Sequence, residues 1–466
     1  MREELRAIVE KNIEPMIDDI RSLVAIPSVL NEATVTPEHS FGPKVSEALA
    51  RFLEIAQRMG FNTKNIDNMV GYAEMGDGPL FGILVHLDVV PGGKESLWKH
   101  GAPFDPTIEG GKLYGRGTID DKGPAVASLY AVKALIDADT PLKYRFRVIA
   151  GLDEESGFRC MKRYQQTEEI PQASFSPDSI FPVVNAEKGI LQFSLSKKIS
   201  NLELAGLPEL FDIRGGDALN VVPDELKMFF KNAAAGYLEY HLLPIGATVT
   251  NTGRGIIVKV PGHAAHASRP HEGENAIQKF LSVAAQLDFG PPELHLELVK
   301  LGALLSGTDG TGLGVACVDE VSGPLTCNFA RISYADGTIS AGCDIRYPVT
   351  GDGEAIAERI ARAARGIGWS AEILHLDPPL YVEEKSALVK TLLAAYEEVT
   401  GEKAKPVSIG GGTYSRSMPN SVSFGATFPG DERTAHTANE YISLASLARM
   451  THVYAEALAR INDGVS

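Results

Sequence analysis

Hydrophobic positions in residues 2–60 recur at helical spacing, with one interruption by a polar loop. The pattern changes at "LFGILVHLDVV" (80–90), a compact apolar run rich in β-branched side chains. Such a run predicts a strand that is buried on both faces of a mixed or parallel sheet. A helical stretch, "PAVASLYAVKALIDA" (124–138), and a second apolar run, "YRFRVIAGL" (144–152), follow it. Strand, loop, helix and strand in this order predict an α/β domain.

The pattern shifts again near Gly189, to short alternating segments such as "LQFSLSKKI" (191–199) and "GIIVKV" (255–260). Turn residues separate these segments, which predicts an inserted α+β domain over residues 189–381. The stretch "ALVKTLLAAYEEVTG" (387–401) then returns to the helical spacing of hydrophobic residues seen in the first segment. We therefore expect residues 1–188 and 382–466 to form one domain, with a mixed sheet flanked by helices. A chain of 466 residues is long enough for two separate cores.

Composition narrows the class of protein. The apolar share of 44% and the charged share of 22% are typical of a soluble globular protein. The net charge of −16 argues against a nucleic-acid partner, because nucleic-acid binders usually carry a basic face. The four cysteines show no C-x-x-C spacing, so neither a zinc finger nor a dithiol site is indicated. Without a signal-peptide core or an apolar run of about 20 residues, we expect a cytoplasmic protein with no membrane partner.

Polar residues cluster where the two predicted strands end, which is where open α/β sheets bind ligands. "HLD" follows the first strand and "DEESG" (153–157) the second. If the first strand extends to Asp88, then His86 and Asp88 point to the same side. A carboxylate often orients a metal-binding histidine in this way. For the triplet alone, a buried histidine with a satisfied hydrogen bond is the more ordinary interpretation, because lone histidines are common.

The acidic residues of "DEESG" have two interpretations: they form a solvated loop, or the two glutamates have different catalytic roles. In the second, one glutamate binds a cation while its neighbour takes a proton from a metal-bound water. Asp178 in "FSPDSIFP" and His436 in "RTAHTANE" are further candidates. Together the candidates offer enough oxygen and nitrogen ligands for two divalent ions bridged by one carboxylate: they are His86, Asp120, Glu155, Asp178 and His436.

Five motifs in this order resemble those of the dinuclear M20 metallopeptidases: "HLDVVP", "GRGTIDDKGP", "DEESG", "AHASRPHEGENA" and "AHTANE". The long insertion and "GGGTYSR" are most similar to the peptidase V branch of bacterial dipeptidases, which includes enzymes named for Xaa-His substrates. The resemblance implies a catalytic domain like that of the dinuclear zinc aminopeptidases, with the insertion as a lid domain. It further implies hydrolysis of unblocked dipeptides by a water that bridges two divalent ions, Zn or Mn.

Carried over by motif, the resemblance implies that His86, Asp120 and Asp178 hold one ion. The second ion would be held by Asp120, Glu155 and His436. Asp120 thus bridges the two ions, and the peptide bond that joins it to Asp121 is expected to be cis.

The resemblance also implies the catalytic and substrate-binding residues. Glu154 would be the general base, and Asp88 would orient the histidine of "HLD". In the lid, His266 would stabilise the oxyanion, with Asn220 nearby. A guanidinium binds a carboxylate with two hydrogen bonds, and a glycine-rich turn can present N–H groups to an anion. The substrate carboxylate would accordingly be bound by Arg346 and by the backbone of Gly411, Gly412 and Thr413.

Two alternatives stay open. One is an N-acyl amino acid deacylase of the same superfamily, with the same metals and base but a lid pocket that receives an acyl chain. The other is a catalytically silent metal-binding homologue, although the intact Glu154 argues against it. A nicotinamide enzyme is excluded because G-x-G-x-x-G would need glycine where Asp120 stands. A lid longer than in dimeric relatives implies a monomer.

Overall fold

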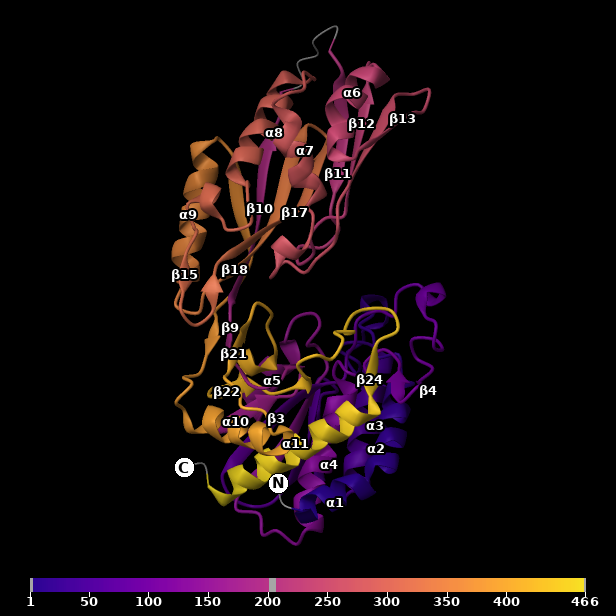
Figure 1. Ribbon diagram of the computed structural model, residues 1–466, viewed down its shortest axis with the longest axis vertical. Coiled ribbons are helices and arrows are strands. Elements are labelled where there is room, and N and C mark those ends of the chain that lie inside the picture. Colours follow the sequence, from indigo (N-terminus) through magenta and orange to yellow (C-terminus); the bar gives the residue numbers. More distant parts are fainter. Residues whose placement is uncertain (1–2, 201–206, 465–466) are drawn as a thin grey trace. The chain divides into compact units, whose positions relative to one another are not determined.

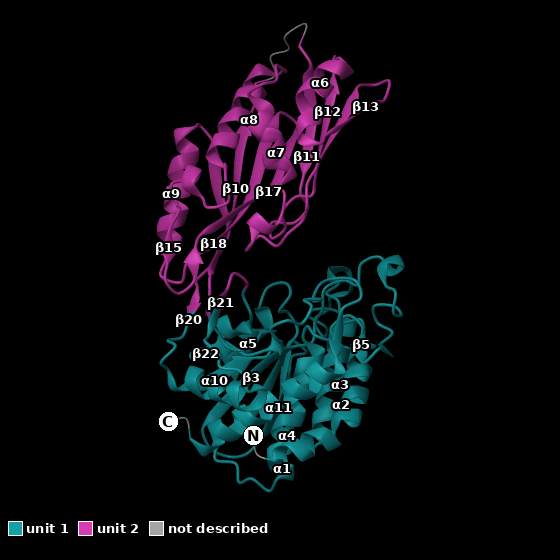
Figure 2. Cartoon of the chain, viewed as in Figure 1, with its two compact units in different colours: residues 1–185, 381–407, 412–466 teal, residues 186–380, 408–411 magenta. Residues whose placement is uncertain are grey.

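The computed structural model describes residues 3–200 and 207–464 (Figure 1). The chain divides into two compact units (Figure 2). Unit 1 comprises Met1–Asn185, Tyr381–Val407 and Gly412–Ser466, and unit 2 comprises Ala186–Leu380 and Ser408–Gly411. Each unit has its own cluster of buried hydrophobic side chains. None of the helices in the described part of the chain combines the length and apolar composition that a membrane span requires.

Unit 1 is built around a mixed sheet. Its four central strands run parallel, and antiparallel strand pairs adjoin them on both sides. All seven residues of the central strand β3 (Leu80–His86) are buried, as expected for a strand that is covered on both faces. In spatial order the strands are β1 (Asn62–Ile66), β2 (Val70–Met75), β6 (Arg145–Gly151), β3 (Leu80–His86), β7 (Ala173–Ser176), β22 (Ser421–Ser423), β9 (Val184–Glu187) and β20 (Leu380–Tyr381), with β21 (Val407–Ile409) paired to β9.

Helices flank this sheet. Helix α4 (Lys122–Asp137) packs against β3 and β6, and α11 (Leu444–Asp463) packs beside α4 (Figure 1). A smaller sheet places the segment before α11 against the segment before α4; its strands are β4 (Thr107–Glu109), β5 (Lys112–Tyr114) and β24 (Tyr441–Ser443). The helices of unit 1 are α1 (Glu3–Lys11), α2 (Ile13–Val24), α3 (Pro43–Arg58), α4 (Lys122–Asp137), α5 (Arg159–Thr167), α10 (Ala387–Thr400) and α11 (Leu444–Asp463).

Unit 2 is built around an eight-stranded antiparallel sheet with helices on one face (Figure 1), and a separate two-stranded sheet joins β15 (Val318–Asp319) to β16 (Gly323–Pro324). Alternation along the strands explains this layer. In β12 (Glu225–Lys231), Leu226, Met228 and Phe230 are buried, while Glu225 and Lys227 are exposed. The strand order is β13 (Thr248–Asn251), β14 (Ile256–Pro261), β12 (Glu225–Lys231), β11 (Glu209–Gly215), β17 (Thr326–Ala335), β18 (Thr338–Tyr347), β10 (Gly189–Lys198) and β19 (Ser370–Asp377). The helices are α6 (Ala235–Leu242), α7 (Ala276–Ala284), α8 (Pro292–Leu304) and α9 (Gly353–Gly366).

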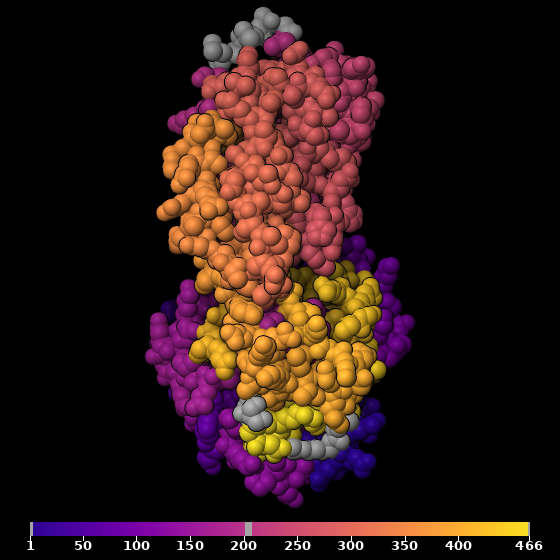
Figure 3. Space-filling view, turned by 60° about the vertical axis from the view of Figure 1, so that its left-hand side comes forward, coloured from indigo at the N-terminus to yellow at the C-terminus, as the bar shows by residue number. Residues whose placement is uncertain are grey.

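Figure 3 shows α8 and α9 on the outer surface of unit 2, in coral and orange. The predicted fold class, a mixed sheet flanked by helices with an α+β insertion, is confirmed. The chain changes unit between Asn185 and Ala186 and between Leu380 and Tyr381. Residues 408–411 also belong to unit 2, so the chain returns to that unit once more.

Candidate metal centre

The carboxyl ends of the parallel strands β6, β3 and β7 meet at one edge of the unit 1 sheet. His86 is the last residue of β3, and Asp178 lies two positions beyond the end of β7. Glu154 and Glu155 follow the end of β6 at Gly151. The strands therefore deliver these polar side chains to the edge where ligands bind in open α/β sheets.

Two groups of possible metal ligands form at this edge. One consists of His86, Asp120 and Asp178, the other of Asp120, Glu155 and His436, with all ligand atoms of a group within 4.8 Å of one another. The Nε2 atom of His86 lies 2.9 Å from Asp120 Oδ1 and 3.6 Å from Asp178 Oδ2. The Nε2 atom of His436 lies 3.0 Å from both Asp120 Oδ2 and Glu155 Oε1. Asp120 thus faces a different histidine with each carboxylate oxygen.

The spacing of these atoms fits divalent cations. Nitrogen and oxygen ligands at about 2.0–2.2 Å from a tetrahedral ion lie about 3.3–3.6 Å apart. The separations between the histidine nitrogens and the carboxylate oxygens, 2.9–3.6 Å, come within a few tenths of an ångström of that spacing. Imidazole and carboxylate are also the donor types that zinc accepts, while carboxylates suit manganese. The chemistry and the spacing of the donors both fit two ions.

Burial and like charge make this cluster electrostatically unfavourable without cations. Burial and the charge of Asp178 raise the pKa of Glu154 well above its ordinary value. Burial and the charge of Asp120 raise the pKa of Asp178 to about 7. Burial alone would raise the pKa of Asp120 as well, but hydrogen bonds with the two histidines hold it below its ordinary value. Bound cations would stabilise the charged carboxylates and remove this conflict.

The two adjacent aspartates point to different surroundings. The peptide bond between Asp120 and Asp121 is cis, as the resemblance implies. Asp121 is fully buried, and its Oδ2 accepts a hydrogen bond from the backbone N–H of His86 at 3.1 Å. Asp121 therefore contacts the end of β3, while Asp120 belongs to both candidate ligand groups.

Asp88 makes different contacts from those that strand alternation suggests, because β3 already ends at His86. The backbone oxygen of Asp88 lies 2.9 Å from His86 Nδ1, and its carboxylate oxygen Oδ1 lies 3.6 Å from that atom. The carboxylate accepts hydrogen bonds from the backbone N–H groups of Glu154 at 3.2 Å and Glu155 at 3.1 Å. Asp88 therefore joins the histidine to the turn that carries the two glutamates.

Two further residues hold this turn, and no sequence pattern singles out their roles. Asp153 is buried, and its carboxylate accepts hydrogen bonds from the Arg159 backbone N–H at 2.9 Å and Nε at 2.8 Å. The hydroxyl of the buried Tyr414 accepts a hydrogen bond from the backbone N–H of Asp153 at 3.2 Å. The ring of Tyr414 also lies edge-on to His86, with 6.2 Å between ring centroids. Tyr414 is in "GGGTYSR", but only its tertiary contacts identify this role.

Unit 2 brings most of the other expected residues close to one another. The backbone N–H of Ala267 donates to the oxygen of Asn220 at 2.8 Å, which joins the Asn220 segment to that of the exposed His266. The Nδ1 atom of His266 lies 2.7 Å from Ser268 Oγ. Ser268 packs so closely on Gly410 that a Cβ at Gly410 would lie 2.4 Å from the Ser268 Cβ.

Arg346 also contacts the Gly410 segment, because its Nη1 donates a hydrogen bond to the backbone oxygen of Gly410 at 2.8 Å. Its other nitrogens donate to both carboxylate oxygens of Asp344, at 2.6 and 3.0 Å. Asp344 is a partner that sequence reasoning missed. Gly411 belongs to unit 2, whereas Gly412 and Thr413 belong to unit 1. Thr413 is buried, with its hydroxyl 2.9 Å from that of Ser423.

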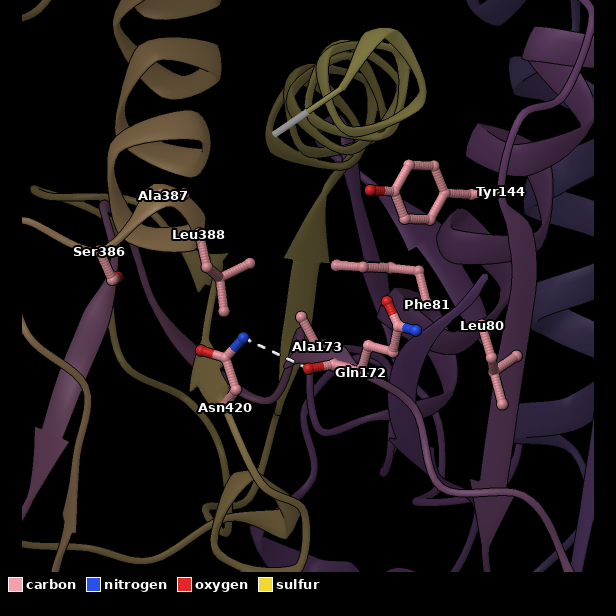
Figure 4. Close-up of a pocket in the computed structure, with 9 residues that line it drawn as sticks. All are labelled: Leu80, Phe81, Tyr144, Gln172, Ala173, Ser386, Ala387, Leu388 and Asn420. Atoms are coloured by element: carbon pink, nitrogen blue, oxygen red, sulfur yellow. Dashed lines mark hydrogen bonds between the residues drawn. The ribbon is translucent and has the colours of Figure 1, made fainter. Parts of the chain in front are cut away.

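A separate cavity of about 250 Å³ lies elsewhere in unit 1 (Figure 4). Leu80 and Ala173, at the amino ends of β3 and β7, line it, so it lies at the opposite edge of the sheet from His86. None of the candidate ligands contributes to it. Its lining residues are Leu80, Phe81, Tyr144, Gln172, Ala173, Ser386, Ala387, Leu388 and Asn420.

Residues 82–460 match the model of Peptidase family M20/M25/M40. The chain therefore belongs to this family of metallopeptidases, and it is a hydrolase. The family resemblance predicted from the five motifs is confirmed. Membership of the family implies divalent metal ions, and the two groups of histidine and carboxylate side chains supply suitable ligands.

Relatives along the full chain carry dipeptidase names. "Putative dipeptidase YtjP" of Bacillus subtilis is 35% identical over 466 residues, which cover 98% of this chain and 99% of that protein. "Putative dipeptidase SH1171" of Staphylococcus haemolyticus is 34% identical, over 95% and 96% of the two chains. Among solved structures, human carnosine dipeptidase 1 is similar with a TM-score of 0.62 at 14% identity, over 99% of this chain and 98% of that one. This last likeness shows the fold alone.

Proposed function

We propose that the chain is a metal-dependent dipeptidase that hydrolyses the peptide bond of unblocked dipeptides. The observation that carries this proposal is the pair of three-residue ligand groups that share Asp120, with Glu154 beside them in the same turn as Glu155. The dipeptidase names of relatives that align over nearly the whole chain support the substrate class.

In this proposal two ions, Zn or Mn, are held by the two groups. His86, Asp120 and Asp178 would bind one ion, and Asp120, Glu155 and His436 the other. When bound, the ions would supply Lewis-acid polarisation of the scissile carbonyl and a lowered pKa for the attacking water. The 2.9–3.6 Å spacing of the histidine nitrogens and carboxylate oxygens supports this assignment.

Glu154 is the general base of the proposed reaction. Its carboxylate takes a proton from the attacking water and passes it to the leaving amine. A general base works best when its pKa is close to the working pH. Burial raises the pKa of Glu154, and bound cations would offset part of that rise. Asp88 holds the backbone N–H groups of Glu154 and Glu155, so it would aim the base and the neighbouring ligand together.

For unit 2 we propose substrate-binding roles. His266 would donate a hydrogen bond to the developing oxyanion, with Asn220 assisting. Arg346, with the backbone of Gly411, Gly412 and Thr413, would bind the free carboxylate of the substrate. The support is that unit 2 joins the His266 loop, Gly410 and Arg346 through short contacts. Because Arg346 already pairs with Asp344 through two nitrogens, we propose that Asp344 fixes its orientation.

The test is amine release from a panel of dipeptides, tripeptides and N-acyl amino acids, with and without added Zn²⁺ or Mn²⁺. We expect cleavage of dipeptides only, loss of activity after chelation, and recovery when metal is restored. Preference for N-acyl amino acids would identify a deacylase, and undiminished activity in metal-free protein would refute the metal mechanism. We also propose a monomer, since unit 2 builds an extended sheet within one chain; an obligate dimer by mass measurement would contradict this.

A further inference from the structure

Glu440 is a fully buried carboxylate next to the loop that carries Asp120. Its Oε1 accepts hydrogen bonds from the backbone N–H groups of Gly117 at 2.9 Å and Ile119 at 3.2 Å. Its Oε2 accepts a hydrogen bond from Nη1 of Arg116, which is also buried. Three donors from four consecutive residues thus converge on a single side chain.

The same residue belongs to the segment that carries His436, four positions earlier in the sequence. The backbone oxygen of Glu440 accepts a hydrogen bond from the N–H of Gly115 at 3.0 Å, and the next residue, Tyr441, pairs with Tyr114 in the β24–β5 ladder. Glu440 therefore ties the segment before α4 to the segment before α11, through its side chain and its backbone. Asp120 and His436 come one from each segment, and Asp120 Oδ2 lies 3.0 Å from His436 Nε2.

The loop needs such a restraint because of its composition. Gly115 and Gly117 have φ values of 152° and 89°, which residues with a side chain rarely adopt. Glycines allow this backbone conformation, but without contacts to other segments they would also allow many others. A buried carboxylate that accepts hydrogen bonds from two backbone N–H groups restricts those alternatives. Leaving these buried donors without a partner would cost folding free energy.

We propose that Glu440 is a positioning residue for the metal centre. By holding the backbone of residues 117–119, it keeps Asp120 between the two candidate ion sites and close to His436. This inference deepens the proposed function and rests on its metal assignment. Glu440 itself touches neither the substrate nor the ions in this scheme; it acts through Asp120.

The test compares Glu440→Gln with the unaltered chain in metal binding. A neutral glutamine keeps the size of the side chain but presents an amide either to Arg116 or to the two backbone N–H groups, so the loop loses part of its restraint. We expect Mn²⁺ titration of metal-free protein by calorimetry to show two ions in the unaltered chain. In the variant, we expect affinity at the weaker site to fall about 10-fold or more, as for other residues that orient metal ligands.

A matched control is Asp19→Asn, which alters another buried carboxylate of unit 1. Asp19 accepts hydrogen bonds from Arg58 Nη2 and from the Tyr130 hydroxyl at 2.8 Å, and it is not part of either ligand group. We expect this variant to lower the melting temperature of metal-free protein while leaving Mn²⁺ affinity within about twofold. If both variants lose affinity in proportion to their loss of stability, Glu440 is merely structural and the proposal is overturned.

Arg116→Gln provides a second route if Glu440→Gln does not fold. It removes the cation that fixes the Glu440 carboxylate and leaves the backbone contacts in place, so we expect a smaller loss of Mn²⁺ affinity, about threefold to 10-fold. Unchanged affinity in either folded variant would overturn the proposal. Metal binding is measured without substrate, so absence of dipeptide cleavage would refute only the proposed function. If the unaltered chain binds no Mn²⁺ or Zn²⁺, both proposals fail.

Discussion

At the scale of single residues, Asp120 and Asp121 have the same side chain but different partners. Both oxygens of Asp120 face histidine nitrogens, whereas Asp121 accepts a hydrogen bond from the backbone of His86. An asparagine at position 121 can accept the same hydrogen bond through its amide oxygen. An asparagine at position 120 would present an amide group, which is a poor ligand, to one of the ions.

We therefore expect Asp120→Asn to lose most metal binding and at least about 1,000-fold in dipeptidase activity, on the scale of losing a central catalytic group. Asp121→Asn should retain two ions, measured as metal content per chain after dialysis. Equal loss of metal in the two variants would contradict the assignment of the bridging role to Asp120.

Glu154 and Glu155 are adjacent but are proposed to perform different tasks. Glu154→Gln removes the base without removing a ligand, so we expect both ions to stay bound while turnover falls about 100-fold to 10,000-fold. Glu155→Ala removes a ligand that lies 3.0 Å from His436, so we expect the loss of one ion. Metal content and turnover measured on the same samples separate the two effects. Equal metal loss in both variants would refute this division of labour.

At the scale of elements, one buried carboxylate joins three parts of unit 2. Glu297 on α8 is 1% exposed and accepts hydrogen bonds from Lys197 of β10 at 2.8 Å, Lys300 at 2.9 Å and Trp369 Nε1 at 2.7 Å. Burial alone would raise the pKa of Glu297, but these three hydrogen bonds lower it below its ordinary value. The charged form of Glu297 therefore stabilises the folded unit.

We expect Glu297→Gln to lower the free energy of unfolding of unit 2 by about 2–3 kcal/mol at pH 7. A carboxylate whose pKa is lowered by folding stabilises the protein above its unfolded-state pKa of about 4.3, and this contribution is lost as the pH falls through the lower folded-state pKa. The difference between the two chains in urea unfolding should therefore shrink below about pH 4.3. An exposed control, Glu358→Gln on α9, should change stability by less than about 0.5 kcal/mol at either pH. A difference that is independent of pH would contradict a role for the charge.

At the scale of the whole molecule, local patterns predicted the elements but not their long-range contacts. The apolar run at 80–90 and the helical stretch at 124–138 became β3 and α4, because each carries its own periodicity. The contacts of Asp88 with Glu154 and Glu155 span more than 60 residues, and those of Tyr414 with Asp153 span 261, so no local pattern encodes them.

The local pattern of hydrophobic and polar residues also does not predict that residues 408–411 belong to unit 2. The glycines there are equally compatible with an ordinary loop, and the contact that explains them is the close approach of Ser268 to Gly410. Residue chemistry at the predicted strand ends and in other loops singled out five candidate ligands, but their division between two ions came only from the motifs that resemble those of a known family. Periodicity and composition alone left a solvated acidic loop as an open alternative.

The two separate hydrophobic clusters lead to a prediction for the whole chain. Because each unit has its own core, we expect two unfolding transitions in calorimetry. All five candidate metal ligands belong to unit 1, so only its transition should respond to metal. At a free Mn²⁺ concentration about 100 times the dissociation constant, one bound ion stabilises the unit by about 2.7 kcal/mol.

Glu297→Gln identifies the transition of unit 2, since that residue lies in the core of unit 2. The variant should lower the midpoint temperature of one transition, and Mn²⁺ should leave the midpoint of that same transition unchanged. Chelation should lower only the midpoint of the unit 1 transition. If metal raised the temperature of the Glu297-sensitive transition to the same extent, the two units would be coupled in unfolding. The location of both proposed ion sites within unit 1 would then no longer account for the stabilisation.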